Sequence, residues 1–157
     1  MNTFRFLALT ILMSSVFSCS EDYIYSQNQI IDDGIWFYDD IKTFEVELND
    51  VDILYSLHLL VKHSQDYKFE NVYMKIHTTF PTIEKKEEQI TINLSDKMGD
   101  WVGNCSGNTC KVKVFLLEDF KIPEAGSYSF SFEQYTRVAS LEGIQELQLQ
   151  ILEVHDK

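Results

Sequence analysis

Proline and glycine are scarce in this sequence, with only two prolines and six glycines among 157 residues. A chain so poor in both has little room for long disordered linkers. Hydrophobic residues make up 45% of the chain and aromatic residues 13%, which is enough to build a core. We therefore expect a chain that folds into one domain rather than a string of modules.

The sequence also lacks an apolar run of the roughly 20 residues that a membrane-spanning helix needs. A shorter apolar stretch, residues 6–17, follows the positively charged Arg5 and ends just before Ser18 and Cys19. A basic tip, an apolar stretch and a small residue before a cysteine are typical of a bacterial lipoprotein signal peptide. The resemblance to a lipobox implies cleavage after Ser18, which removes residues 1–18, and a lipid on the Cys19 sulfur. The alternative is an ordinary secretory signal with an incidental cysteine.

Basic residues are few: 13 lysines and arginines stand against 25 aspartates and glutamates, which gives a net charge of −12. Removal of residues 1–18 takes away one further positive charge, Arg5, and no negative charge. Because this charge repels phosphate backbones, we expect no nucleic-acid partner. It also disfavours a domain that lies flat on an anionic membrane. We expect the lipid to hold the domain at the cell envelope while the charge keeps it soluble.

Only three cysteines are present, and the lipid would occupy Cys19, which leaves Cys105 and Cys110 as a pair in an oxidising compartment. The residues between them, Ser-Gly-Asn-Thr, can form a tight turn, so a disulfide here would staple a hairpin tip. Chain-entropy arithmetic gives so short a ring about 2 kcal/mol of stabilisation. A redox pair is the alternative, although thioredoxin-type chemistry normally uses a two-residue spacing.

Apolar and polar residues alternate in a series of short runs, which is the pattern of half-buried β-strands. The runs cover residues 44–48, 54–61, 72–77, 90–94, 111–116, 128–132 and 147–151. Separated by turn signals, they predict an all-β fold: a single antiparallel β-sandwich of about seven strands and immunoglobulin-like size. We assign residues 34–157 to this domain and the acidic stretch 19–33 to a tether. A short helical turn is expected within residues 136–142.

No arrangement of residues points to catalysis or to a bound metal. The sequence has no nucleophile elbow and no glycine-rich phosphate loop. His58 and His63 are five residues apart, so on one straight strand they would point to opposite faces and could not share a metal. Acidic pairs such as Asp32-Asp33 lack the glycine and the ligand spacing of a calcium loop, and we favour solvated turns over weak calcium sites. We therefore expect no catalytic residue, no cofactor and no metal.

Three side chains are candidates for a partner or ligand surface: Trp36, Trp101 and Arg137. Each tryptophan would anchor the sandwich if buried, and would hold a sugar ring or a partner side chain if exposed. Burial is the interpretation that we favour for both. Arg137 follows an apolar strand, and we expect it to form a bidentate pair with a carboxylate, either within the chain or across an interface.

Several segments, in order along the chain, resemble the gliding-motility lipoprotein family GldH of Bacteroidetes. The segment from Asp96 to Gly103 is similar to the family's Asp-Lys-x-Gly-x-Trp-x-Gly stretch. The other matching positions are Tyr25, Ile31, Gly34-Ile35-Trp36, Asp39-Asp40, Thr43-Phe44, Ile122-Pro123, Gly126, Tyr128, Phe130, Glu133-Gln134, Arg137 and Leu141-Glu142-Gly143-Ile144. The chain departs from the family at residues 134–137, where Gln-Tyr-Thr-Arg replaces the more usual Gln-Ala-Met-Arg. The loop between Cys105 and Cys110 is not a family signature.

The resemblance implies a non-enzymatic lipoprotein that is accessory to gliding motility and to the associated type IX secretion machinery. It carries over no catalytic or cofactor residue. The resemblance also implies envelope protein partners and an outer-membrane location. Glu21-Asp22 resembles the acidic export signal of surface-exposed lipoproteins, and retention on the periplasmic face is the alternative. The alternative is a glycan-binding surface lipoprotein, in which Trp36, Trp101 or Tyr128 would stack on sugar rings.

Overall fold

The computed structural model describes residues 23–82 and 84–154, which form eleven β-strands and one short 3₁₀ turn. In chain order the elements are β1 (Tyr23–Ile30), η1 (Asp32–Gly34), β2 (Ile35–Phe37), β3 (Lys42–Leu48), β4 (Leu54–Ser64), β5 (Asn71–Thr79), β6 (Lys85–Asn93), β7 (Asn104–Ser106), β8 (Thr109–Phe120), β9 (Gly126–Gln134), β10 (Ser140–Glu142) and β11 (Ile144–Val154). The pairings between these strands are antiparallel. Cys19 and the signal segment 1–18 lie outside the described residues.

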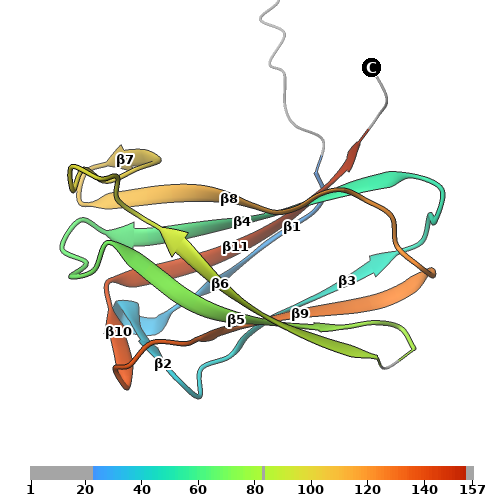
Figure 1. Cartoon of the computed structure of the whole chain (residues 1–157), viewed down its shortest axis with the longest axis horizontal. Coiled ribbons are helices and arrows are strands. Elements are labelled where there is room, and N and C mark those ends of the chain that lie inside the picture. Colours follow the sequence, from blue (N-terminus) through green and yellow to red (C-terminus); the bar gives the residue numbers. More distant parts are fainter. Residues whose placement is uncertain (1–22, 83, 155–157) are drawn as a thin grey trace, which may run out of the picture.

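Two sheets enclose the core (Figure 1). One has the strand order β1-β11-β4-β8-β7 and the other β3-β9-β5-β6, while β10 and β2 form a separate pair at one end. The alternation of apolar and polar residues along each strand decides which face of the strand is buried. In β3, Phe44 and Val46 are buried while Glu45 and Glu47 are exposed. Across the four-stranded sheet, the rings of Phe44 and Phe132 meet edge to face, with 5.8 Å between their centroids. The prediction of an all-β antiparallel sandwich is confirmed.

Each of the predicted strands is present, and the structure adds four that the sequence did not reveal. The largest difference concerns the expected tether, because residues 23–30 form β1, which pairs along β11 from Tyr23 to Ile30. Most of the β1 side chains are exposed or only half-buried, so its sequence shows little apolar alternation. Main-chain hydrogen bonds, rather than apolar burial, hold this edge strand in place. The strands β2, β7 and β10 have three residues each, which is too short for a period of two to show.

The prediction of a helical turn within residues 136–142 is wrong. This stretch consists of bends followed by β10. Leu141 at the centre of β10 is buried and pairs with Trp36 of β2. An apolar side chain that pairs across a short sheet is better satisfied in extended backbone than in an isolated helical turn.

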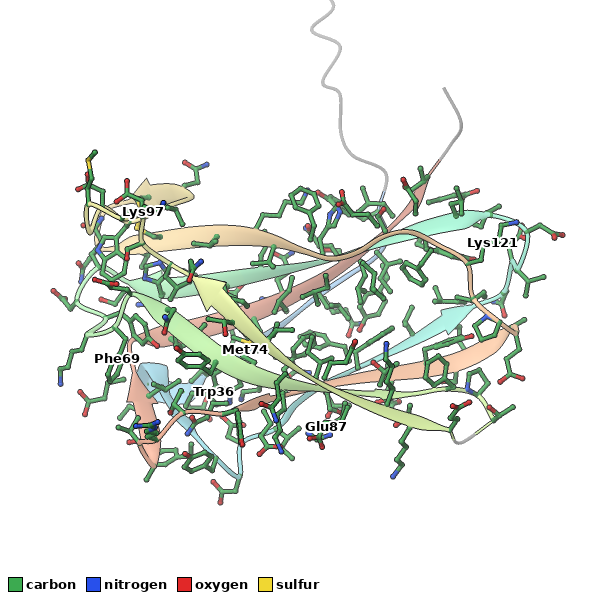
Figure 2. The ribbon with its side chains drawn as sticks, in the orientation of Figure 1. Trp36, Phe69, Met74, Glu87, Lys97 and Lys121 are labelled. Atoms are coloured by element: carbon green, nitrogen blue, oxygen red, sulfur yellow. A yellow bond between two sulfur atoms is a disulfide. The ribbon has the colours of Figure 1, made fainter. Side chains whose placement is uncertain are left out.

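The two ends of the sandwich differ, and the difference bears on function. At one end lie Tyr23, where β1 begins, and Phe120, where β8 ends; we call this the tether end. At the other end lie β10 and the turn between β7 and β8, and we call this the loop end. Along β11, the stretch from Ile144 to Leu152 separates the two ends by about 27 Å. Figure 2 shows Lys97 at the loop end and Lys121 at the tether end.

Within the described part of the chain, the structure holds no helix with the length and apolar character needed to span a membrane.

Candidate functional site

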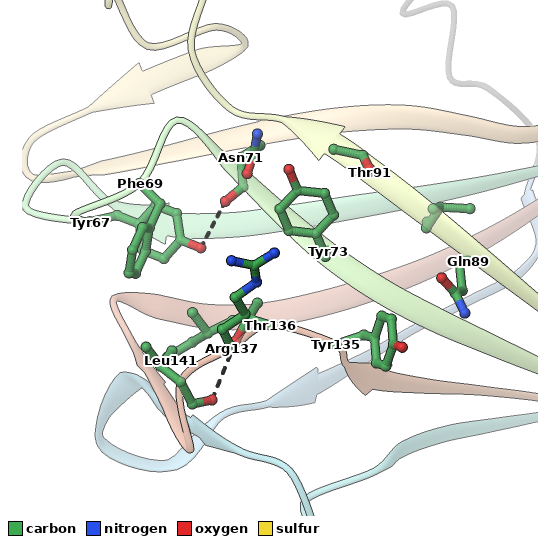
Figure 3. Close-up of a pocket in the computed structure, with 12 residues that line it drawn as sticks. Tyr67, Phe69, Asn71, Tyr73, Gln89, Thr91, Tyr135, Thr136, Arg137 and Leu141 are labelled. Atoms are coloured by element: carbon green, nitrogen blue, oxygen red, sulfur yellow. Dashed lines mark hydrogen bonds between the residues drawn. The ribbon is translucent and has the colours of Figure 1, made fainter.

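A cavity of about 790 Å³ opens at the loop end, on the outer face of the four-stranded sheet (Figure 3). Among the described residues, its lining combines aromatic rings, neutral polar side chains and a single charged residue, Arg137. The aromatic residues are Tyr67, Phe69, Tyr73 and Tyr135; the neutral polar ones are Asn71, Gln89, Thr91 and Thr136; the aliphatic ones are Ile90, Val138 and Leu141. Pockets that bind small molecules are typically mostly apolar, with a few placed polar groups. This cavity is therefore the candidate functional site.

The floor of the cavity follows from alternation along β5. Val72 and Met74 are buried in the core, so Tyr73 between them points to the outer face. Thr91 of β6 pairs directly with Tyr73 and lies on the same face. Tyr135 completes this floor, because its backbone N–H donates to the carbonyl oxygen of Tyr73 at 2.8 Å.

The wall that carries Arg137 is shaped by one buried amide, the side chain of Gln134. Its Nε2 donates to the carbonyl oxygens of Val138 at 3.2 Å and Ala139 at 3.4 Å. Its Oε1 accepts from the backbone N–H of Thr136 at 3.2 Å and from the Thr136 hydroxyl at 2.6 Å. A buried amide whose oxygen and nitrogen are both satisfied holds a loop in a single shape. Gln134 thus fixes the loop that presents Arg137.

The opposite wall is built around Tyr67. Its ring is buried, and its hydroxyl donates to the carbonyl oxygen of Asn71 at 3.0 Å. Burial raises the pKa of the Tyr67 phenol well above its ordinary value, so this hydroxyl stays a neutral donor. Gly143, with φ +103°, passes so close that a Cβ there would lie 3.2 Å from the Tyr67 Cα atom. A glycine at this position therefore lets β10 and β11 pack against the wall.

Arg137 lies exposed on the rim, and its guanidinium points into the cavity toward Asn71 and Tyr73 (Figure 3). No carboxylate of residues 23–82 or 84–154 forms an ion pair with it. The expected carboxylate pair is therefore not made inside the described chain. An exposed guanidinium with its hydrogen-bonding fork unused can receive an anion from outside.

The two tryptophans do not form a surface platform. Trp36 is 0% exposed, and its Nε1–H donates to the carbonyl oxygen of Asp40 at 2.7 Å. Burial therefore removes Trp36 from any partner or ligand surface. Trp101 is half-buried, packs against the core and meets His63 edge to face at 4.8 Å between ring centroids. Tyr128, the third ring considered for sugar stacking, is also buried.

Next to the cavity wall lies the hairpin of β7 and β8, in which Cys105 and Cys110 form a disulfide across a directly paired position. The hairpin turn is tied to the segment that follows β4. The backbone N–H of Gln65 donates to the carbonyl oxygen of Asn108 at 3.0 Å, and Asn108 Nδ2 donates to Asp66 Oδ2 at 2.8 Å. The stapled hairpin and the cavity wall that begins at Tyr67 are thus parts of one connected surface.

Removing the disulfide should lower stability without changing the fold. The double variant Cys105→Ser/Cys110→Ser is expected to lose about 2 kcal/mol of unfolding free energy, the chain-entropy contribution of a short ring. Urea denaturation followed by far-UV circular dichroism measures this loss. The wild-type protein treated with a reductant is the matched control and should show the same loss. Variant and wild-type midpoints that coincide would contradict the prediction.

His63 gives the domain a pH dependence. Its ring is fully buried, Nδ1–H donates to the carbonyl oxygen of Ser64 at 2.9 Å, and Nε2 has no hydrogen-bond partner among the described residues. Burial lowers the pKa of His63 below its ordinary value of 6.5, and the Ser64 contact only partly opposes this. The unfolded chain therefore binds a proton at His63 more readily than the folded chain does. The free energy of unfolding keeps its full value with respect to His63 above pH 6.5 and decreases as the pH falls below 6.5.

We expect His63→Phe to flatten the pH dependence of stability between pH 7 and pH 5. The limiting slope for one group is about 1.4 kcal/mol per pH unit. Urea denaturation of the wild-type and variant proteins at both pH values measures the difference, and titrating carboxylates contribute equally to both proteins. Equal slopes would show that His63 titrates normally in the folded state.

The sequence pointed to Arg137 but missed the rings around it. Tyr73 stands at an outward position of a predicted strand, and an aromatic residue at such a position was the available signal. Tyr67, Phe69 and Tyr135 lie outside the predicted strands, in segments whose spacing says nothing about which rings will meet. The tertiary arrangement alone brings these four rings together.

The family model and the two relatives that match this chain carry the same family description. A family model described as GldH lipoprotein matches residues 23–151. The chain is 26% identical over 148 residues to the gliding motility lipoprotein GldH homolog of Christiangramia forsetii, covering 94% of this chain and 88% of the relative. It is 22% identical over 143 residues to the gliding motility lipoprotein GldH of Flavobacterium johnsoniae, covering 87% and 88%.

Among solved structures, similarity is low. A protein of Listeria monocytogenes EGD-e matches 70% of this chain and 8% of its own at 20% identity, with a TM-score of 0.33. The VP2 subviral particle of infectious bursal disease virus matches 83% of this chain and 33% of its own at 11% identity, with a TM-score of 0.36. Scores this low support no inference about fold or function.

Proposed function

The chain belongs to the GldH lipoprotein family, and we propose that this gliding-motility lipoprotein is a non-enzymatic accessory of the gliding and type IX secretion machinery. In this role it is anchored in the outer membrane by a lipid on Cys19 and acts by binding protein partners. Family membership is the observation that carries the proposal. The mechanism is positioning, because a tethered domain is present at high effective concentration next to its membrane partners.

The placement of the tether end supports a domain that projects from the bilayer. Cys19 precedes Tyr23 by four residues, which span at most about 14 Å when extended. A lipid on Cys19 therefore keeps the tether end close to the membrane. The loop end, about 27 Å further along β11, then faces away from the membrane. The net charge of −12 opposes a flat orientation on anionic lipids.

The exposed apolar side chains at the loop end support a protein contact there. Met98, in the loop before β7, is 90% exposed. Four further apolar residues are exposed around the segments that flank β2 and β10: Phe37, Tyr38, Ile41 and Val138. The Tyr38 hydroxyl donates to the carbonyl oxygen of Thr136, which joins the two segments. Tyr38 and Val138, which this contact brings near each other, are exposed apolar residues of the kind found at interaction surfaces.

Deletion of the gene in the bacterium of origin tests the proposal. We expect deleted cells to lose surface spreading and to retain type IX cargo proteins that the parent exports. A copy of the wild-type gene should restore both properties, whereas a Cys19→Ser copy should restore neither. Deleted cells that spread and secrete as the parent does would refute the proposed role.

A further inference from the structure

We propose that the cavity at the loop end is a binding site for acidic saccharides, with Arg137 on the carboxylate of a uronic acid residue and aromatic rings against the sugar. This activity goes beyond the proposed role in motility and secretion, and it requires no protein partner. Four features of the cavity lead to it: its charge, the free guanidinium, the exposed rings and the neutral polar groups.

The charge of the cavity is opposite to that of the chain. The sequence holds 25 acidic residues, yet none of the described residues that line the cavity is acidic. Arg137 is the one charged residue in the part of the lining that the structure describes, so the cavity carries a local positive charge on an acidic protein. Such a site attracts an anionic ligand while the rest of the surface repels it.

The planar guanidinium of Arg137 favours a carboxylate as the anion that binds. Arg137 is the only arginine in the sequence besides Arg5 of the signal segment, and every other basic residue is a lysine. A guanidinium presents a planar fork that matches a carboxylate with two parallel hydrogen bonds, which an ammonium cannot do. Because Gln134 fixes the loop that carries Arg137, little ordering of this loop is needed when a ligand binds.

The exposed rings select a ligand with apolar faces. Phe69, Tyr73 and Tyr135 are each 45% exposed, although aromatic side chains of this size are usually more buried. The ammonium of Lys75 lies 4.6 Å from the centroid of the Tyr135 ring and 3.1 Å from a carboxylate oxygen of Glu87, which holds Tyr135 in place. A pyranose ring has apolar C–H faces that pack on such rings.

Neutral polar groups complete the match. The side chains of Asn71, Gln89 and Thr91 add amides and a hydroxyl to the lining, and these can both donate to and accept from sugar hydroxyls. The cavity volume of about 790 Å³ is in the range of small-ligand sites rather than of flat protein interfaces. These features favour a short acidic oligosaccharide over an acidic peptide segment.

Calorimetric titration tests the inference on the full lipidated protein in lipid nanodiscs, with trigalacturonate as the probe. The fully methyl-esterified trisaccharide is the matched ligand without charge. We expect trigalacturonate to bind and the methyl ester to bind at least about tenfold more weakly, because it cannot form the charge-assisted pair with Arg137. Inorganic phosphate and a glutamate-rich peptide are the two comparison ligands, and we expect each to bind more weakly than trigalacturonate.

Variants assign the binding to the cavity. Arg137→Gln should weaken trigalacturonate at least about tenfold, and Tyr73→Ala should weaken both the acid and its ester. Lys68→Gln is the matched control: it removes an exposed cation that pairs with Glu142 at 3.0 Å outside the cavity, and it should change affinity less than twofold. Thermal melts should show that both variants stay folded, because Arg137 is exposed and Tyr73 lies outside the core.

Several results would overturn the inference: no binding of trigalacturonate to the wild-type protein, equal binding by Arg137→Gln, or tighter binding of the peptide or of phosphate. None of these results bears on spreading or cargo export, which test the proposed role independently.

Discussion

Replacing Trp36 with alanine is expected to destabilise the domain by about 3–5 kcal/mol, the typical cost of removing a large buried aromatic side chain. Trp36 is fully buried where β2 pairs with β10, and Leu141 stands opposite it. The substitution leaves a cavity at the loop end and removes the hydrogen bond from Nε1 to the carbonyl oxygen of Asp40. Since domains of this size are stable by about 5–15 kcal/mol, the variant should be close to unfolding.

Urea denaturation followed by far-UV circular dichroism measures this loss, because this signal comes mainly from the backbone, whereas fluorescence comes mainly from the tryptophans. Trp36→Phe is the graded control: it keeps most of the apolar volume, loses the hydrogen bond and should cost clearly less. Trp101→Ala is the second control, because it removes a tryptophan that is only half-buried, and it should reduce the free energy of unfolding less than Trp36→Ala does. A Trp36→Ala protein within 1 kcal/mol of wild type, on the scale of exposed substitutions, would place Trp36 at the surface.

Cys19→Ser is expected to move the whole protein from the membrane fraction to the soluble fraction while the domain stays folded. A lipid of two or more chains holds a protein at the membrane stably, and the serine variant has no sulfur to carry this lipid. The net charge of −12 opposes adsorption to anionic lipid. The effect should therefore be nearly complete rather than partial.

Fractionation of cells, with immunoblotting against a C-terminal tag, measures this change. Cys105→Ser/Cys110→Ser is the matched control, since it removes two cysteines but keeps the anchor and should stay in the membrane fraction. Retention of Cys19→Ser at the membrane would show that another attachment exists and that the signal segment has been misinterpreted.

The strands that sequence reasoning found and missed differ in how they are stabilised. Strands such as β3 bury one face against the core, so Phe44 and Val46 alternate with glutamates and reveal the period. The edge strand β1 is held mainly by its pairing with β11, and its side chains carry little pattern. Main-chain pairing leaves almost no trace in side-chain chemistry, which explains why residues 23–30 resembled a tether.

Of the candidate site, the sequence predicted Arg137 but not the aromatic rings that surround it. Arg137 stood out because arginine is rare in the chain, but only the structure shows that no described carboxylate pairs with it. A tryptophan such as Trp36 can anchor a core or hold a ligand, and its sequence context fits both. The choice depends on the pairing of β2 with β10, which joins segments a hundred residues apart in the chain.

The central claim is that an anchored domain presents its loop end to the gliding and secretion machinery. Site-specific photo-crosslinking in living cells tests it most directly, with the photoreactive residue at Lys97 or at Lys121. Both lysines are exposed, and they lie at opposite ends of the sandwich (Figure 2). We expect adducts with components of that machinery from Lys97 and not from Lys121. Such adducts from Lys121 alone, or from neither position, would contradict the account.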